Sequence, residues 1–319
     1  MRNINFYHCL SFFFTEYLPK ICNLCRNTIT NYRNSINLLF IFCRDVVGVP
    51  PEKLTFQILN DKTIIRFLDW LQTEQKSSDR VINQRIAAVR SFFRYAQIRF
   101  PRYPALARDC QKILKIPFKI NLEKDQRPNM QRLTFEQTQL LLGAPDVETK
   151  QGRRDKTLLS LLYDSAARVQ ELCDLRVKDV RLHSPAIVTL TDKDGETRSV
   201  PLSLGVVRLL RSYMAENRHL QRGNPDIPLF ANRRRLKLTY SGVSKMVQKH
   251  ARALAAQGEN FAESLTPRVL RISKAMHWYQ QGVKMVYLHD WLGNKVISTT
   301  ASYVRGDLES KGKGHSTLT

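Results

Sequence analysis

Apolar residues in the first third of the chain recur at steps of three and four. This is the spacing of a helix that buries one face. The predicted helices begin at Thr28, Asn60, Ser78 and Ala105. Because the connections between them are short, the pattern is typical of a small helical bundle. We therefore expect residues 1–117 to form one helical domain.

The helical pattern stops in the stretch 118–132, which is polar, contains a proline and has little periodicity. These features are typical of a linker between domains. After it, Thr134 followed three residues later by Gln137 is a capping-box pattern that opens a new helix. We expect a second domain over 133–305, and a disordered tail over the polar residues 306–319.

Most of the second domain also has helical periodicity, including a strongly apolar segment at 155–165. Residues 186–191 and 197–201 are instead β-like and flank an Asp194-Gly195 turn. An Asp-Gly pair between two such runs predicts a β-hairpin. The fold class is therefore predicted to be mainly α with a small β-hairpin or sheet, an α+β protein.

The stretch 265–305 has the clearest signals in the chain for where helices start and stop. Pro267 suits the first turn of a helix, where its missing N–H costs nothing. Gly282 and Gly293 end two successive helices, and Ser298 can start a third. Three short helices are thus predicted near the end of the second domain.

The charge of the chain is unusual for its otherwise ordinary composition. Lys and Arg number 51 against 28 Asp and Glu, which gives a formal net charge of +23. Such an excess favours a polyanionic partner, and nucleic acid more than a membrane surface or an acidic protein. No apolar run approaches the roughly 20 residues that span a bilayer. The apolar patch at 12–14 is too short for the core of a signal peptide, so we expect a cytoplasmic protein.

The chain has six cysteines, and Cys22 and Cys25 have the spacing of a metal-binding or redox pair. No second pair of cysteines or histidines completes such a site. We therefore expect buried thiols, no metal site and no cofactor.

The stretch 265–305 places Arg268 and Arg271 before Tyr303. Guanidinium groups bind phosphate oxygens, and a tyrosine hydroxyl can act as a nucleophile, so the set suits chemistry on a phosphate. Each residue also has an ordinary explanation. The arginines can form a basic surface patch, and the tyrosine can pack in a core.

The motifs around these residues resemble those of the tyrosine recombinases, the phage-integrase and Xer-type enzymes. LTPRVLRISKAMHWYQQG is similar to the box around their second catalytic arginine. LGNKVISTTASYV is similar to their Leu-Gly-His box and the nucleophilic tyrosine that follows. Arg168, with Glu171-Leu172 behind it, resembles their first arginine box, and Lys193 resembles their hairpin lysine.

The resemblance implies a function and a role for each residue. The chain would be a site-specific recombinase or integrase that breaks and rejoins duplex DNA through a 3′-phosphotyrosine. A helical SAM-like core-binding domain and a catalytic domain would clamp the DNA, and four protomers would assemble on two sites at the nucleoid. The implied site residues are Arg168, Lys193, Arg268, Arg271, Asn294 and Tyr303. Tyr303 would attack the phosphate, the arginines would bind it, and Lys193 would protonate the leaving oxygen.

Three positions depart from the family pattern. Arg268, Ile272 and Asn294 stand where the family usually has histidines. Arginine stays charged and asparagine does not titrate, so the departures affect proton transfer at Tyr303. Glycines at 306, 312 and 314 also leave little helix after Tyr303, where the family usually has a helix that docks on a neighbouring protomer.

Two other functions remain open on the sequence. The missing histidines and short tail favour a catalytically impaired relic, or a regulator that occupies recombination sites without cutting. A helix-turn-helix repressor would explain the charge but not the order and spacing of the arginines and the tyrosine. The set of Arg168, Lys193, Arg271 and Tyr303 favours the enzyme.

Overall fold

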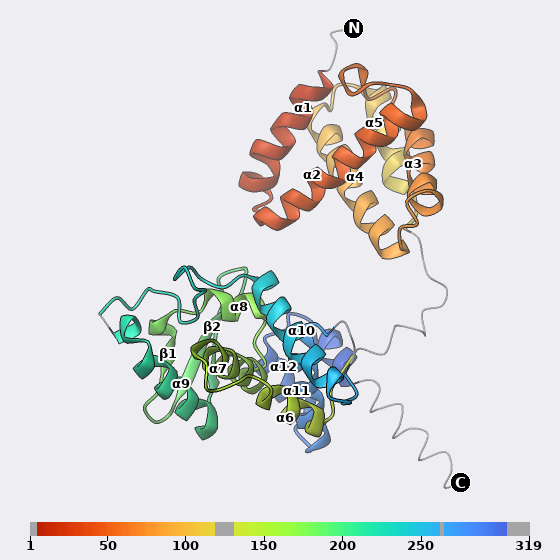
Figure 1. Cartoon of the computed structure of the whole chain (residues 1–319). Coiled ribbons are helices and arrows are strands. Elements are labelled where there is room, and N and C mark those ends of the chain that lie inside the picture. Colours follow the sequence, from red (N-terminus) through yellow and green to blue (C-terminus); the bar gives the residue numbers. More distant parts are fainter. Residues whose placement is uncertain (1–4, 119–130, 222, 262–264, 305–319) are drawn as a thin grey trace. The chain divides into compact units, whose positions relative to one another are not determined.

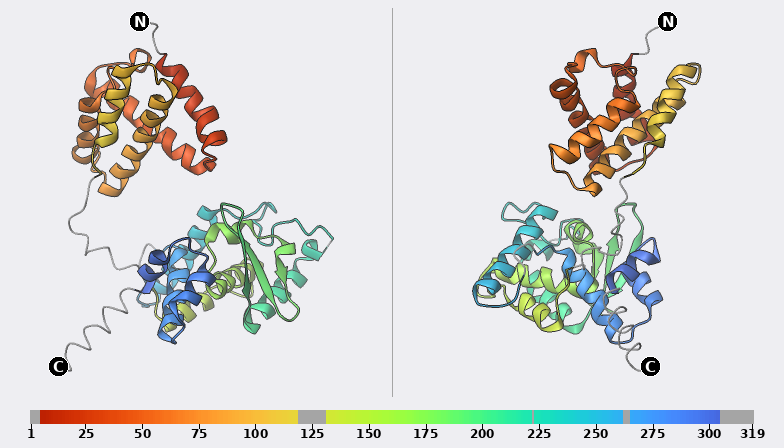
Figure 2. Two further views of the ribbon diagram at one scale, coloured as in Figure 1. Left: turned by 180° about the vertical axis from the view of Figure 1, so that it is seen from behind. Right: turned by 90° about the vertical axis from the view of Figure 1, so that its right-hand side faces the viewer.

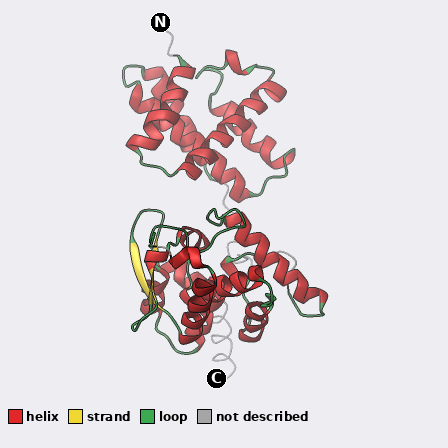
Figure 3. Cartoon of the chain, turned by 60° about the vertical axis from the view of Figure 1, so that its left-hand side comes forward, coloured by secondary structure: helices red, strands yellow, loops and turns green. Residues whose placement is uncertain are grey.

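The computed structural model describes residues 5–118, 131–221, 223–261 and 265–304. The chain divides into two compact units, Met1–Asp125 and Gln126–Thr319 (Figure 1). The described residues are mainly helical, with one three-stranded sheet in the second unit (Figure 3). The predicted fold class is therefore confirmed. Most of the predicted linker and the whole predicted tail, with its glycines, lie outside the described residues.

The first unit is a bundle of helices, shown from two further sides in Figure 2. Its α-helices are α1 (Phe6–Phe12), α2 (Arg26–Phe42), α3 (Asp61–Thr73), α4 (Asp79–Arg99) and α5 (Pro104–Lys115). Wider π-helical segments, Phe13–Ile21 and Cys43–Val47, continue α1 and α2, and Pro51–Lys53 forms a 3-10 turn. The four predicted helices correspond to α2 to α5. The helical segment before them was not predicted.

Aromatic rings fill much of the core of this bundle. Phe13, from the unpredicted segment, packs edge-on against Phe92 of α4, with 5.3 Å between ring centroids. The expectation of buried thiols is wrong for two of the six cysteines. Cys22 and Cys25 are exposed, because they lie in the connection between Phe13–Ile21 and α2 and not within a packed helix.

The second unit joins helices to a small antiparallel sheet. Its α-helices are α6 (Phe135–Gly143), α7 (Lys150–Ser165), α8 (Val169–Asp174), α9 (Leu204–Glu216), α10 (Tyr240–Ala256), α11 (Arg268–Gln280) and α12 (Met285–Leu292). Residues 297–304 are also helical, and Val177–Asp179 and Arg218–Gln221 are 3-10 turns. The strands are β1 (Val180–Arg181), β2 (Ile187–Thr191) and β3 (Thr197–Pro201), in the order β1-β2-β3. The predicted hairpin is β2–β3, with Thr191 opposite Thr197.

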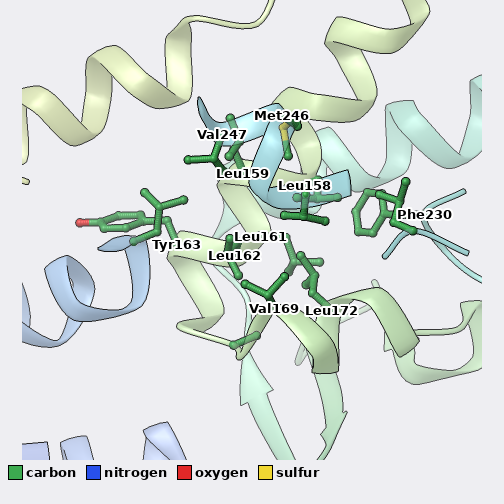
Figure 4. Close-up of a cluster of buried hydrophobic side chains, with 14 of the residues drawn as sticks. Leu158, Leu159, Leu161, Leu162, Tyr163, Val169, Leu172, Phe230, Met246 and Val247 are labelled. Carbon is green, nitrogen blue, oxygen red and sulfur yellow. The ribbon is translucent and has the colours of Figure 1, made fainter. Parts of the chain in front are cut away.

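Helix α7 lies in the middle of the second unit's core (Figure 4). Its leucines at 158, 159, 161 and 162 are almost fully buried, so apolar neighbours surround this part of the helix. Ala166 ends α7 in the left-handed conformation, with φ of 49°. This turn directs the chain into α8, and it fixes Arg168 at the start of α8. No helix among the described residues is long and apolar enough to cross a membrane.

Candidate active site

Arg168 is fixed at the junction of α7 and α8 by a carboxylate and a carbonyl. Its backbone N–H donates to Oε2 of Glu171 at 2.7 Å, and its Nη1 donates to Oε1 of the same residue at 2.7 Å. Nη2 donates to the carbonyl oxygen of Gly293 at 2.7 Å. The side chain remains partly exposed. A guanidinium held in this way can present its remaining N–H groups to an anion.

Arg271 lies on the first turns of α11 and is only 4% exposed. Its Nη1 donates to the carbonyl oxygen of Ala166 at 2.7 Å, and its Nη2 donates to that of Leu292 at 2.7 Å. Burial lowers the pKa of the guanidinium to about 10, and the positive charge of Arg168 acts in the same direction. Arg271 therefore remains charged at neutral pH.

Tyr303 lies on the helix 297–304 and is 5% exposed. It belongs to a small apolar cluster with Ile272 of α11. Nη2 of Arg268 is 3.5 Å from the tyrosine hydroxyl, and Cζ of Arg268 lies 5.6 Å from the ring centroid. Burial raises the pKa of the hydroxyl, but the positive charges of Arg271 and Arg268 outweigh it, so the pKa is lowered overall.

Asn294 is buried, and both ends of its amide are hydrogen-bonded. Oδ1 accepts from Nη2 of Arg271 at 2.8 Å, and Nδ2 donates to Oγ1 of Thr300 at 3.0 Å. The Thr300 hydroxyl in turn lies 3.3 Å from Nδ1 of His289. The amide oxygen therefore faces the arginines, and the amide nitrogen faces the tyrosine-bearing helix.

Lys193 lies apart from the other five predicted residues. It is in the turn between β2 and β3, its side chain is 75% exposed, and its ammonium is 3.3 Å from Asp194. The same carboxylate pairs with Lys295 at 2.5 Å. The tip of the hairpin is thus joined by this ion pair to the segment that follows Gly293. Gly293 and Asn294 accept hydrogen bonds from Arg168 and Arg271.

Arg198 of β3 is a part of this arrangement that the sequence did not indicate. Its Nη1 and Nη2 donate to the two oxygens of Glu171 at 2.8 and 2.7 Å. Glu171 was recognised only as part of the first arginine motif, and it is 3% exposed. Burial raises the pKa of Glu171, but the bonds and charges of Arg198 and Arg168 outweigh this effect and lower it. A buried carboxylate shared by two arginines stays ionised.

The site suits the binding of a phosphate and an attack on it by an oxygen. Arg268 and Arg271 act on the buried hydroxyl of Tyr303. Arg168 is joined to them through Oδ1 of Asn294, which accepts from Arg271 and lies 3.5 Å from Nη2 of Arg168. Within the described residues there is no cluster of His, Cys, Asp and Glu suited to a metal ion. The groups present offer positive charge and a tyrosine hydroxyl whose pKa is lowered.

Two family models match the chain. Residues 131–309 match the phage integrase family, and residues 13–99 match the phage integrase N-terminal SAM-like domain. The putative integrase/recombinase y4rC of Sinorhizobium fredii is 31% identical over 303 residues, which cover 95% of this chain and 88% of that protein. Tyrosine recombinase XerC of Pelobacter propionicus is 26% identical over 296 residues, covering 93% of this chain and 90% of that protein.

Solved structures have the same fold. The XerH site-specific recombinase bound to palindromic difH substrate, in a post-cleavage complex, matches with a TM-score of 0.68 at 18% identity, over 97% of this chain and 87% of that one. The Tn1549 transposon integrase in complex with transposon right-end DNA matches with a TM-score of 0.67 at 17% identity, over 95% and 99%. With the family matches, these findings show that the chain belongs to the phage integrase family of tyrosine recombinases, which cleave and rejoin DNA.

Proposed function

We propose that this protein is an active site-specific recombinase in which Tyr303 is the nucleophile. The observation that supports this most is the position of its hydroxyl, next to Arg268 and under the charge of Arg271. Arg168, Arg268 and Arg271 bind the non-bridging oxygens of the DNA phosphate and stabilise the charge that develops there.

The proposed reaction is a transesterification. The Tyr303 hydroxyl gives its proton to water, which its lowered pKa favours. A bond forms between the tyrosine oxygen and phosphorus, and the bond from phosphorus to the 5′ oxygen of the DNA breaks, which leaves a 3′-phosphotyrosine. Lys193 gives a proton to the departing 5′ oxygen. Its pair with Asp194 is exposed to solvent and therefore weak, so the lysine can leave that carboxylate for the DNA. The reverse attack by a 5′ hydroxyl rejoins the strand.

Asn294 has a different role from a histidine in this proposal. Its amide oxygen holds Arg271, and its amide nitrogen is bonded to Thr300. It therefore orients the phosphate-binding arginine and the tyrosine-bearing helix, and it transfers no proton.

The partner that we propose is double-stranded DNA. The net charge of +23 supports a polyanion, and the XerH and Tn1549 proteins were solved bound to DNA. Residues 1–117 would clamp the duplex and 133–305 would cut it, with 118–132 as the linker between them and 306–319 as a tail. We further propose that four protomers act on two sites, in the cytoplasm at the nucleoid.

One observation favours the alternative of a catalytically impaired regulator. Within the described residues, no histidine or carboxylate is hydrogen-bonded to the Tyr303 hydroxyl, whose charged neighbours are arginines. Among these residues, no side chain is placed to accept the tyrosine proton, so the proton has to pass to water. A protein of this kind would bind the same DNA without forming the covalent bond.

Covalent trapping separates the two functions. The protein is incubated with a tiled set of nicked duplexes that covers the DNA flanking its own gene, and the products are run on a denaturing gel. We expect a slow protein–DNA band that is lost in Tyr303→Phe and kept in Tyr287→Phe, a matched change of an exposed tyrosine on α12.

A second variant tests the regulator directly. If a band forms only in the double variant Arg268→His with Asn294→His, the site is sound but proton transfer is impaired, and the regulator is supported. If no band forms on any duplex in either protein, the proposal of an active enzyme is wrong.

A further inference from the structure

Arg198 is bound on three sides although no motif points to it. It lies on β3, and its side chain is 14% exposed. Besides its two bonds to Glu171, its Nε donates to the carbonyl oxygen of Trp291 at 3.0 Å. Three of the five N–H donors of this guanidinium are therefore bonded to protein groups, and the side chain is largely buried.

The first consequence concerns Glu171 and Arg168. The two oxygens of Glu171 accept from both Arg198 and Arg168. Arg198 meets this carboxylate in the bidentate geometry, which fixes its plane. One oxygen then faces the backbone N–H of Arg168 and the other faces its Nη1. The sharing also balances part of the negative charge of Glu171, so that Arg168 keeps more of its positive charge for a phosphate.

The second consequence concerns residues 291–294, which we call the acceptor turn. Four consecutive residues of this turn accept from three different arginines. The carbonyl oxygen of Trp291 accepts from Arg198, that of Leu292 accepts from Arg271, and that of Gly293 accepts from Arg168. The side chain of Asn294 accepts from Arg271 as well. A shift of the turn would therefore move both phosphate-binding arginines.

Arg198 is also in close contact with the backbone of this turn. Gly293 has φ of 58°, and a Cβ at this position would lie 2.9 Å from Cδ of Arg198. The stem of the arginine thus passes directly beside the glycine whose carbonyl binds Arg168. Because β3 belongs to the hairpin that bears Lys193, Arg198 joins this hairpin, α8 and the acceptor turn.

We propose that Arg198 is a positioning residue of the recombination reaction, which orients Arg168 for the phosphate through Glu171 and the acceptor turn. This inference rests on the proposed function, because it assumes that Arg168 binds the phosphate. In this proposal, Arg198 acts through these protein groups and not directly on the phosphate or on Tyr303. When the Arg198 side chain is removed, Arg168 is the remaining arginine bonded to Glu171. Arg168 is then drawn more strongly toward this carboxylate.

The test compares two DNA substrates at a trapped site. One has the normal scissile phosphate, and the other has a methylphosphonate, which is uncharged and needs less help from an arginine. On normal DNA, we expect Arg198→Met to slow adduct formation about 10- to 100-fold, as supporting residues of a site commonly do. On the methylphosphonate the loss should be several-fold smaller, as it should be for Arg168→Met. A merely structural role would slow both substrates equally.

Conservative and matched variants complete the design. Arg198→Lys should rescue little, because one ammonium cannot bond both oxygens of Glu171 in a fork. Arg181→Met, which changes an exposed arginine of β1 bonded to the carbonyl oxygen of Pro185, should behave like the natural protein. Circular dichroism and a thermal melt confirm that each variant is folded. For a poorly folded Arg198→Met, the double variant with Glu171→Gln removes the buried charge that has lost one of its two arginine partners. The ratio of the rates on the two substrates is then measured for this double variant.

The outcomes separate the inference from the function. Equal slowing on both substrates, or full activity in Arg198→Met, overturns the inference while the function stands. No adduct from the natural protein on any duplex overturns the proposed function, and the inference with it.

Discussion

In the proposed reaction, positive charge activates Tyr303, and no histidine or carboxylate among the described residues is bonded to its hydroxyl. Burial raises the pKa of Tyr303, and Arg271 and Arg268 together lower it below its ordinary value. We expect Arg268→Gln to remove part of the lowering, so that the tyrosine ionises at higher pH. The rate of adduct formation should then rise with pH along a curve shifted to higher pH than that of the natural protein.

The measurement is a single-turnover pH profile of covalent trapping. Arg208→Gln, which changes an exposed arginine of α9, is the matched control and should leave the curve in place. An unchanged midpoint in Arg268→Gln would show that the charge of this residue does not act on the nucleophile.

Lys193 is the predicted residue whose place in the structure says least about its role. Its ammonium is exposed and paired with Asp194. If it protonates the 5′ oxygen, Lys193→Met should slow cleavage about 100- to 10,000-fold, the usual range for a general acid. A substrate with sulfur in place of the 5′ bridging oxygen has a leaving group that needs no proton, so it should restore most of the rate. Equal loss on both substrates would instead assign Lys193 to binding.

The sequence indicated the site residues that belong to recognisable motifs. It did not indicate Arg198, whose proposed role depends on its contact with Glu171. Arg168, Arg271 and Tyr303 follow short patterns that can be read along the chain. Arg198 contacts Glu171 across 27 residues, and only the fold brings the strand next to the helix. An isolated arginine on a predicted strand gives no sign of such a contact.

At the scale of elements, the acceptor turn links the stability of the fold to the geometry of the site. Gly293→Ala places a Cβ in the left-handed region and 2.9 Å from Cδ of Arg198. We expect it to lower the free energy of unfolding by roughly 1–2 kcal/mol for the backbone alone, with a further loss from displacing Arg198. Urea denaturation measures the sum.

A double-mutant cycle isolates the second part. If the new methyl group meets Arg198, Gly293→Ala should cost less in an Arg198→Ala background, because that side chain is gone. Gly282→Ala, at a left-handed glycine with open space around its Cβ, gives the backbone penalty alone. If the losses of unfolding free energy from Gly293→Ala and Arg198→Ala are additive, the new methyl group and Arg198 move apart without an energetic cost.

Each of the two elements that the sequence failed to predict has its own physical reason. In the segment 5–21, exposed Tyr7 and Phe12 stand beside buried Phe6 and Phe13, and this mixture hides the helical period. Strand β1 has two residues, which is too short for any alternation. The hairpin β2–β3 was predictable because its Asp194-Gly195 turn fixes the pairing.

At the scale of the whole molecule, the net charge follows from the sequence without knowledge of the fold, and it predicts how the protein binds its partner. A chain with a formal charge of +23 should bind duplex DNA mainly by releasing counterions from phosphates. With several such contacts, we expect the affinity to fall roughly a thousandfold or more between about 50 and 200 mM salt. Fluorescence anisotropy on a labelled duplex measures this slope.

Competition between different polyanions shows which partner the basic surface binds. Polyglutamate and phosphatidylglycerol vesicles present negative charge without the regular phosphate spacing of a duplex, so they should compete weakly for the protein. Tyr303→Phe keeps the charge of the chain and should show the natural slope, because binding precedes the covalent step. A shallow slope on DNA, or stronger binding to polyglutamate or the vesicles, would mean that the basic surface serves another partner. A steep fall of DNA affinity with salt, equal in the natural protein and in Tyr303→Phe, would show that the basic surface binds DNA phosphates. The covalent step would then depend separately on Tyr303 and the arginines around it.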